Sequence, residues 1–92
     1  MVKTIIHLAG ALARIAGEKT VELEAENLGG ALEALAQMFG EDLERKLFDE
    51  NGIPRRFFNI YIDGREYRLK DGIETKLSEG SSISIIPAVS GG

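Results

Sequence analysis

The stretch that decides the fold is Ser-Ile-Ser-Ile-Ile-Pro-Ala-Val-Ser-Gly-Gly, residues 82–92. Its first half alternates, which predicts a half-buried strand with Ile83 and Ile85 facing the core. Pro87 has no backbone N–H, so we expect the strand to stop where it reaches this residue. The residues that follow carry no charged side chain and end in two glycines. We therefore predict a strand that leads into an extended, flexible tail over residues 87–92.

The tail ends in a carboxylate, which is an anion at neutral pH. Gly91 and Gly92 have no Cβ, so they fit a slot too narrow for any side chain, and the acyl carbon of Gly92 is unhindered. We interpret this carboxylate as the functional group and the rest of the chain as the domain that presents it. The alternative is an idle tail, because chain ends rich in small residues are common.

Outward from the tail, hydrophobic patterns predict the remaining elements. Residues 10–17 are expected to form a short connection or a helical turn. The last strand is expected to lie beside the first, in a mixed sheet of about five strands packed on one main helix. The domain is then a two-layer α+β unit over residues 1–92. We predict strands at 2–9, 19–25, 57–62, 65–68 and 82–86, a main helix from Asn27 to near Gly40, and a short helix at 41–49.

Composition narrows the function classes. The chain has 92 residues, no cysteine and one histidine, which excludes disulfides and a cysteine nucleophile and argues against a metal site. A net charge of −4 argues against binding to nucleic acid. No signal peptide or membrane span is recognised, so we expect a cytoplasmic protein. Phosphate-loop, zinc-protease and nucleophile-elbow motifs are absent from the sequence, so a self-contained enzyme is not expected.

An apolar surface is expected next to the tail. If Ile83 and Ile85 face the core, Ile86 lies on the outer face of the sheet, and Tyr61 and Phe57 are placed to join it. An apolar group beside a presented tail is typical of a partner-docking surface. The alternative is a set of scattered surface apolar residues, which are normal in soluble proteins.

Residues 77–92, Leu-Ser-Glu-Gly-Ser-Ser-Ile-Ser-Ile-Ile-Pro-Ala-Val-Ser-Gly-Gly, resemble the end of MoaD, the small subunit of molybdopterin synthase, which is one of the MoaD/ThiS-like family of ubiquitin-like sulfur carriers. Residues 8–17 resemble its first loop, and residues 47–64 resemble its middle. The resemblance implies a β-grasp fold, which agrees with the predicted order of elements.

The resemblance also implies a mechanism. An E1-like, MoeB-like enzyme would use ATP to adenylate the Gly92 carboxylate, and a sulfur donor would convert the adenylate to a thiocarboxylate. Ser90 and Gly91 would thread the pocket of a MoaE-like large subunit, while Leu8 and Ile86 would dock on the partner. The chain itself would bind no cofactor and would act as a non-catalytic, sulfur-donating subunit.

Other functions remain open at this stage. A ubiquitin-like modifier would join Gly92 to lysines of other proteins, and a thiamin-type carrier would deliver sulfur to a different acceptor. A β-grasp binding module would leave the tail idle, since this fold serves many functions. The long middle segment, residues 41–54, favours the molybdopterin form over the thiamin form. The sequence leaves the choice between molybdenum and tungsten, and the sulfur donor, undetermined.

Overall fold

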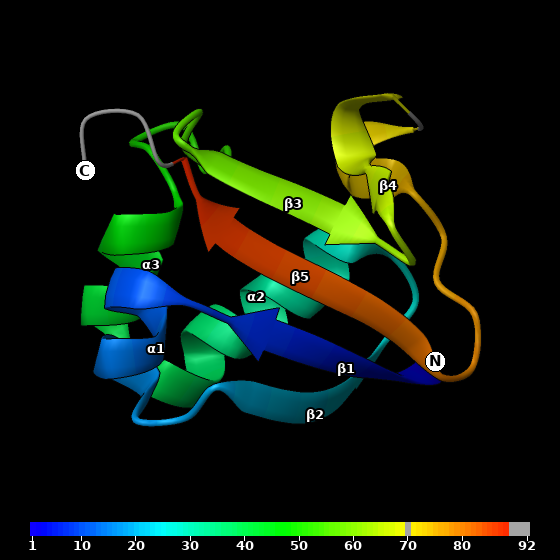
Figure 1. The fold of residues 1–92 in the computed structure, drawn as a ribbon, viewed down its shortest axis with the longest axis horizontal. Helices are drawn as coiled ribbons and strands as arrows, with labels where there is room; N and C mark the ends of the chain where they lie inside the picture. Colours follow the sequence, from blue (N-terminus) through cyan, green and yellow to red (C-terminus); the bar gives the residue numbers. More distant parts are fainter. Residues whose placement is uncertain (70, 89–92) are drawn as a thin grey trace.

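The computed structural model describes residues 1–69 and 71–88, which form a mixed sheet covered by helices on one face (Figure 1). The sheet has five strands in the order β2-β1-β5-β3-β4. This arrangement confirms the predicted two-layer α+β fold. The elements are β1 (Val2–Leu8), α1 (Gly10–Ala16), β2 (Thr20–Ala25), α2 (Leu28–Phe39), α3 (Glu41–Leu47), β3 (Phe58–Ile62), β4 (Arg65–Glu66), the 3-10 turns η1 (Tyr67–Leu69) and η2 (Gly72–Glu74), and β5 (Ser81–Pro87).

The middle of the sheet is the pairing of the first and last strands. β1 and β5 run parallel, in a register from Thr4 opposite Ser81 to Leu8 opposite Ile85. The buried Thr4 hydroxyl donates a hydrogen bond to the Ser81 carbonyl oxygen at 2.7 Å, across 77 positions of sequence. β3 then pairs with the other side of β5 in antiparallel orientation. The prediction that the last strand lies beside the first is confirmed.

The core lies between the sheet and the helices. Ile83 and Ile85 of β5 are fully buried, and Leu77, just before this strand, is 8% exposed. α2 packs its apolar stripe on the same face of the sheet, because its apolar residues recur at helical spacing. The alternation predicted for the last strand is therefore correct. The other fully buried large side chains are Ile6, Leu12, Leu28, Leu32, Leu35, Leu43, Leu47, Phe58, Ile60 and Ile62.

The structure decides one local prediction that was left open and corrects another. Residues 10–16 form the helix α1, because fully buried Leu12 anchors it and Gly17 ends it in a left-handed conformation with φ 75°. The return strand over residues 65–68 is shorter than predicted, since β4 ends at Glu66. Tyr67 then turns inward in η1 and is 8% exposed, so core packing replaces the strand pairing.

The pair Gly29-Gly30 in the first turn of α2 has a packing role. Asn27 caps the helix as predicted, and its Oδ1 accepts the Gly30 N–H at 2.8 Å. A Cβ on Gly30 would lie 3.2 Å from that same oxygen, and a Cβ on Gly29 would lie 3.2 Å from the Ile73 carbonyl oxygen. The two glycines therefore let the cap and η2 approach the helix closely.

Leu35→Ala tests the core. Leu35 is fully buried in α2, whereas Met38 in the same helix is 55% exposed. We expect Leu35→Ala to lower the free energy of unfolding by about 2–5 kcal/mol, since it removes apolar contacts and leaves a cavity. Met38→Ala is the control and should change it by about 0.5 kcal/mol or less. Urea unfolding followed by circular dichroism measures both, and equal effects would contradict this packing.

Candidate functional site

The candidate site is the end of β5, where the chain leaves the sheet. Pro87 pairs with Phe58 and is the last residue of β5, one position inside the tail that the sequence predicted. Ala88 follows, and its N–H donates a hydrogen bond to the Phe57 carbonyl oxygen. Strand N–H groups alternate in direction, so the N–H that Pro87 lacks would face the β1 side, where pairing has already stopped at Leu8. The proline therefore costs the sheet no hydrogen bond.

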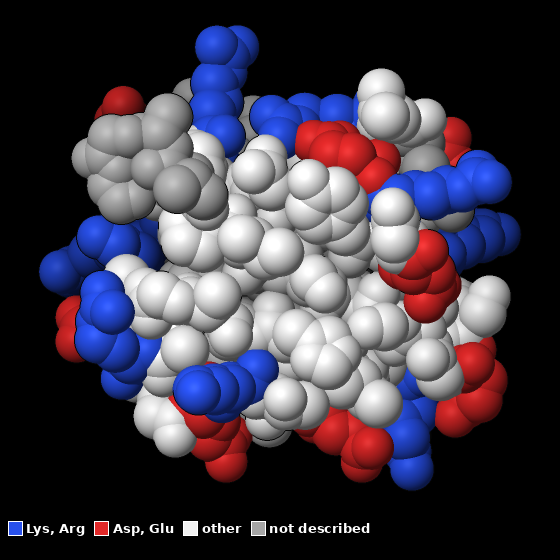
Figure 2. Space-filling view, in the orientation of Figure 1, with Lys and Arg blue, Asp and Glu red and all other residues white. Residues whose placement is uncertain are grey.

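Beside this point, the face of the sheet that lacks helices is open. We call it the open face and define it by the outward side chains of β1, β5 and β3, of which only Lys3, at the start of β1, is charged, so that the centre of the face is uncharged. Figure 2 shows this uncharged centre with acidic and basic side chains gathered around its margin. The surface therefore favours contact with a partner surface that is uncharged at its centre. Its members are Lys3, Ile5, His7, Asn59, Tyr61, Ser82, Ser84 and Ile86.

A row of polar side chains crosses the open face, and sequence reasoning did not identify it. His7 lies opposite Ser84 on β5, and Ser84 lies opposite Tyr61 on β3. His7 is exposed, while the other two are half-buried. The sequence alone indicates on which face of its strand each of these three side chains lies. It does not show that the three are neighbours, because their alignment depends on which strands pair.

The structure separates the four residues predicted to dock a partner. Ile86 is 42% exposed and Phe57 is 46% exposed, both where β5 ends, and Tyr61 is half-buried on the open face. Leu8, in contrast, is 5% exposed and belongs to the core. It faces the helices because it shares strand parity with buried Ile6. The Leu8 side chain is therefore unavailable to a partner, and the prediction for this residue is corrected.

The remaining predicted site residues are those of the tail itself. Ser90, Gly91 and Gly92 lie outside the described residues, as does Val89. The described part of the site is therefore the base from which this segment leaves the domain. The roles of Ser90, Gly91 and Gly92 stay predictions.

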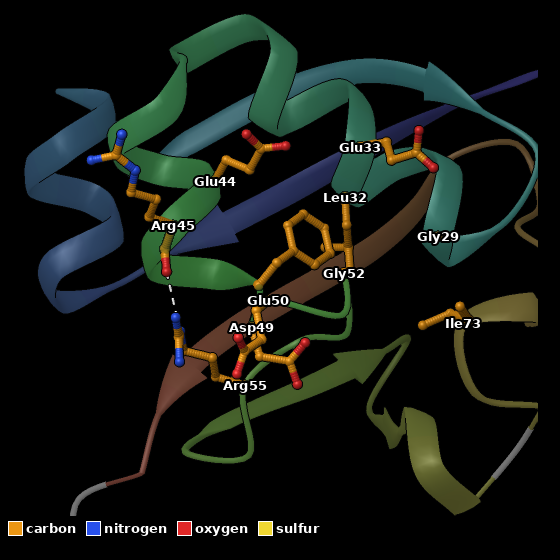
Figure 3. Close-up of a pocket in the computed structure, with 11 residues that line it drawn as sticks. Gly29, Leu32, Glu33, Glu44, Arg45, Asp49, Glu50, Gly52, Arg55 and Ile73 are labelled. Carbon is orange, nitrogen blue, oxygen red and sulfur yellow. Dashed lines mark hydrogen bonds between the residues drawn. The ribbon is translucent and has the colours of Figure 1, made fainter.

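A separate hollow lies in the helix layer, between α2, α3 and the loop after α3 (Figure 3). Its volume is about 610 Å³, and Leu32 and Phe48 contribute apolar side chains to it. The Arg55 Nε donates a hydrogen bond to the Arg45 carbonyl oxygen at 3.1 Å across one side of it. The lining includes none of the residues predicted to carry or dock the tail. This hollow therefore lies in the helix layer and is not part of the candidate site.

Two absences apply to residues 1–69 and 71–88. Over these ranges, no cluster of three or more His, Cys, Asp or Glu side chains could hold a metal ion. No helix in the same ranges is long and apolar enough to cross a membrane.

The ThiS family model matches residues 6–92, nearly the whole chain and through both terminal glycines. The chain belongs to the ThiS family, a family of ubiquitin-like sulfur carriers. The match joins the last strand and the terminal glycines in one sequence pattern. It also agrees with the resemblance recognised in the sequence.

Curated relatives of this ThiS-family chain carry the name of sulfur carrier. A protein of Archaeoglobus fulgidus, whose name assigns it provisionally to the sulfur carriers, is 33% identical over 76 residues. That alignment covers 83% of this chain and 85% of the relative. The sulfur carrier protein CysO of Mycobacterium tuberculosis is 32% identical over 77 residues, which is 83% of each chain.

Solved structures support the ubiquitin-like, β-grasp architecture. The small archaeal modifier protein 1 of Methanosarcina acetivorans superposes with a TM-score of 0.90 at 28% identity, covering 100% of this chain and 98% of that chain. CysO of Mycobacterium tuberculosis gives 0.82 at 27% identity, covering 94% and 99%. A molybdopterin converting factor subunit 1 from Pyrococcus furiosus, so named provisionally, gives 0.76 at 20% identity, covering 97% and 100%, and shows the fold alone.

Alanine substitutions at Leu8 and Ile86 test the assignment of Leu8 to the core and of Ile86 to the surface. Leu8→Ala removes a core side chain that is 5% exposed, and should cost about 2–5 kcal/mol of unfolding free energy. Ile86→Ala changes a residue that is 42% exposed, and should cost about 0.5 kcal/mol or less. Urea unfolding measures both values. A mild effect at Leu8 together with a severe effect at Ile86 would mean that the strand faces are reversed.

Proposed function

We propose that this protein is a sulfur carrier that works through its C-terminal Gly92. The observation that carries the proposal is the place where β5 ends. The strand runs through the middle of the sheet and brings Ala88, four residues before the terminal carboxylate, to the border of an open face whose centre is uncharged. The family match extends through residue 92 and supports the same reading.

The chemistry takes place at the acyl carbon of Gly92. A carboxylate oxygen attacks the α-phosphorus of ATP in the partner enzyme, pyrophosphate leaves, and an acyl-adenylate forms. A sulfur donor at the oxidation level of sulfide then attacks the acyl carbon, and AMP leaves with the bonding electron pair. The product is a thiocarboxylate, which is a soft nucleophile at neutral pH. Attack on an electrophilic acceptor and hydrolysis by water deliver the sulfur and restore the carboxylate.

The chain supplies presentation and docking, while the activating enzyme supplies the chemistry. The open face offers Ile86 and Tyr61 beside exposed Phe57, with no charged side chain to desolvate at its centre. We expect an E1-like adenylating enzyme to bind this face and to receive Ser90, Gly91 and Gly92 in a narrow channel. ATP is then a substrate of that enzyme and not a ligand of this chain.

For the acceptor, we propose the pterin precursor of molybdopterin, with this chain as small subunit and a MoaE-like protein as large subunit. The support is the sequence resemblance over residues 8–17, 47–64 and 77–92, together with the shared fold. The test is reconstitution: the thiocarboxylated chain and the large subunit should convert the precursor to the dithiolene product. An intact thiocarboxylate after incubation with a competent large subunit would contradict this acceptor.

Thiocarboxylation itself is tested by intact-mass spectrometry. After incubation with an E1-like enzyme, ATP and a sulfide source, the mass should rise by the difference between one sulfur and one oxygen atom. Deleting Gly91-Gly92 should abolish the shift, because the deletion removes the terminal residues that are proposed to enter the enzyme. Glu24→Gln, on the exposed edge strand β2, is the matched control and should shift as the wild type does. No shift with an enzyme that modifies another carrier would refute the proposal.

A second candidate function is protein modification. The observation that favours it is the likeness to the small archaeal modifier protein 1 of Methanosarcina acetivorans, at 28% identity and a TM-score of 0.90. In this reaction, a lysine amine of another protein attacks the acyl carbon of the Gly92 adenylate, AMP leaves with the bonding electron pair, and an isopeptide bond forms. Expressing an epitope-tagged chain in its own cell and blotting for higher-mass conjugates tests this function. Conjugates that survive denaturation and reducing agent, and vanish on deletion of Gly91-Gly92, would support it.

A further inference from the structure

We propose that Gly10 is a positioning residue which, with the Phe57 carbonyl group, clamps Pro87 and Ala88 and thereby aims the tail for adenylation. This inference rests on the proposed sulfur-carrier function and deepens it. The clamp consists of Gly10 on one flank of β5 and Phe57 on the other. Neither flank includes a residue of the tail beyond Ala88.

On the first flank of β5, the backbone of Gly10 lies close to the ring of Pro87. Gly10 follows β1 and opens α1 with φ +60°, a conformation that residues with a side chain rarely adopt. A Cβ built on Gly10 would lie 3.1 Å from Pro87 Cγ and 3.8 Å from Pro87 Cδ. Gly10 is therefore required twice, once for its backbone angle and once for the room it leaves. The proline ring fills the place that a side chain at residue 10 would take.

The second flank is the hydrogen bond from the Ala88 N–H to the Phe57 carbonyl oxygen. It continues the β3–β5 ladder one step past the pair of Phe58 and Pro87. The ring of Pro87 also fixes its own φ at about −65°, directly before the residue that donates this hydrogen bond. The exit direction of the chain is therefore constrained on both sides of β5, although β1 has already ended.

The clamp matters because the chain beyond it is short. Four residues follow Ala88, and fully extended they reach about 14 Å. If the exit direction were free, the carboxylate would sample a far larger set of positions around the domain edge. Fixing the exit removes part of the ordering cost that the activating enzyme would otherwise have to meet when it binds.

A double-mutant cycle with a matched control tests the clamp. Gly10→Ala introduces a Cβ against Pro87, Pro87→Ala removes the ring, and the double variant combines them. Gly17→Ala is the control, because Gly17 also has positive φ, at +75°, but has nothing within 4 Å of its Cβ position. Two readouts are measured on the full chain. They are the steady-state constants for adenylation by an E1-like enzyme and the hydrogen-exchange rate of the Ala88 amide.

We expect Gly10→Ala and Pro87→Ala each to raise KM for the carrier by about 3- to 10-fold, with kcat within about twofold of wild type. Both should speed exchange at Ala88, and the double variant should resemble either single variant, because each disrupts the same packing between residues 10 and 87. Gly17→Ala should leave KM and Ala88 exchange unchanged while it lowers stability. Pro87→Ala avoids the backbone strain at residue 10, so its effect does not depend on how well Gly10→Ala folds.

Three outcomes would overturn the clamp: equal effects of Gly10→Ala and Gly17→Ala on KM, unchanged Ala88 exchange in Pro87→Ala, or additive effects in the double variant. Failure of the proposed function is distinguishable. In that case the wild-type chain is not adenylated by an enzyme that accepts another carrier, and the positioning role of Gly10 falls with it. The exchange rates of Ala88 then still decide whether Gly10 holds the base of the tail.

Discussion

The parallel pairing of β1 with β5 is the constraint on which the rest of the structure depends. It joins segments about as far apart as the chain allows, with a buried hydrogen bond from Thr4 to Ser81 at its start. Because β5 also pairs with β3, the final strand occupies the middle of the sheet. Central strands are difficult to displace, since their backbone groups are bonded on both sides. A C-terminal segment attached to such a strand starts from a rigid support.

The same pairing explains how a small domain can present a chain end. β1 stops at Leu8 and turns into α1, while β5 continues to Pro87 along β3 alone. The final strand β5 thus extends beyond the end of β1 but stays paired with β3, so the chain leaves the sheet at a defined point. The helices cover the opposite face, which leaves an uncharged surface next to this exit (Figures 1 and 2). Membership in the ThiS family gives that arrangement a purpose, since these proteins carry sulfur and need a partner to load it.

Much of the fold could be predicted from local pattern. The alternation around Ile83 and Ile85, the helical spacing after Asn27 and the turn chemistry between elements all act within a few residues. The prediction left α1 open between a connection and a helical turn, and the helix depends on Leu12 packing in the core. It was wrong for Tyr67, which leaves the edge strand to pack inward. Both cases have one cause: tertiary contacts outweigh weak local preferences.

The candidate site divides in the same way. The sequence by itself supplied the proposed chemistry, because the terminal glycines and the uncharged side chains before them are features of the covalent chain. Only the tertiary structure decided that Leu8 belongs to the core, and that Gly10 lies against Pro87. These facts depend on strand register and on contacts between residues distant in sequence. Such contacts exist only once the sheet has formed, so no local pattern records them.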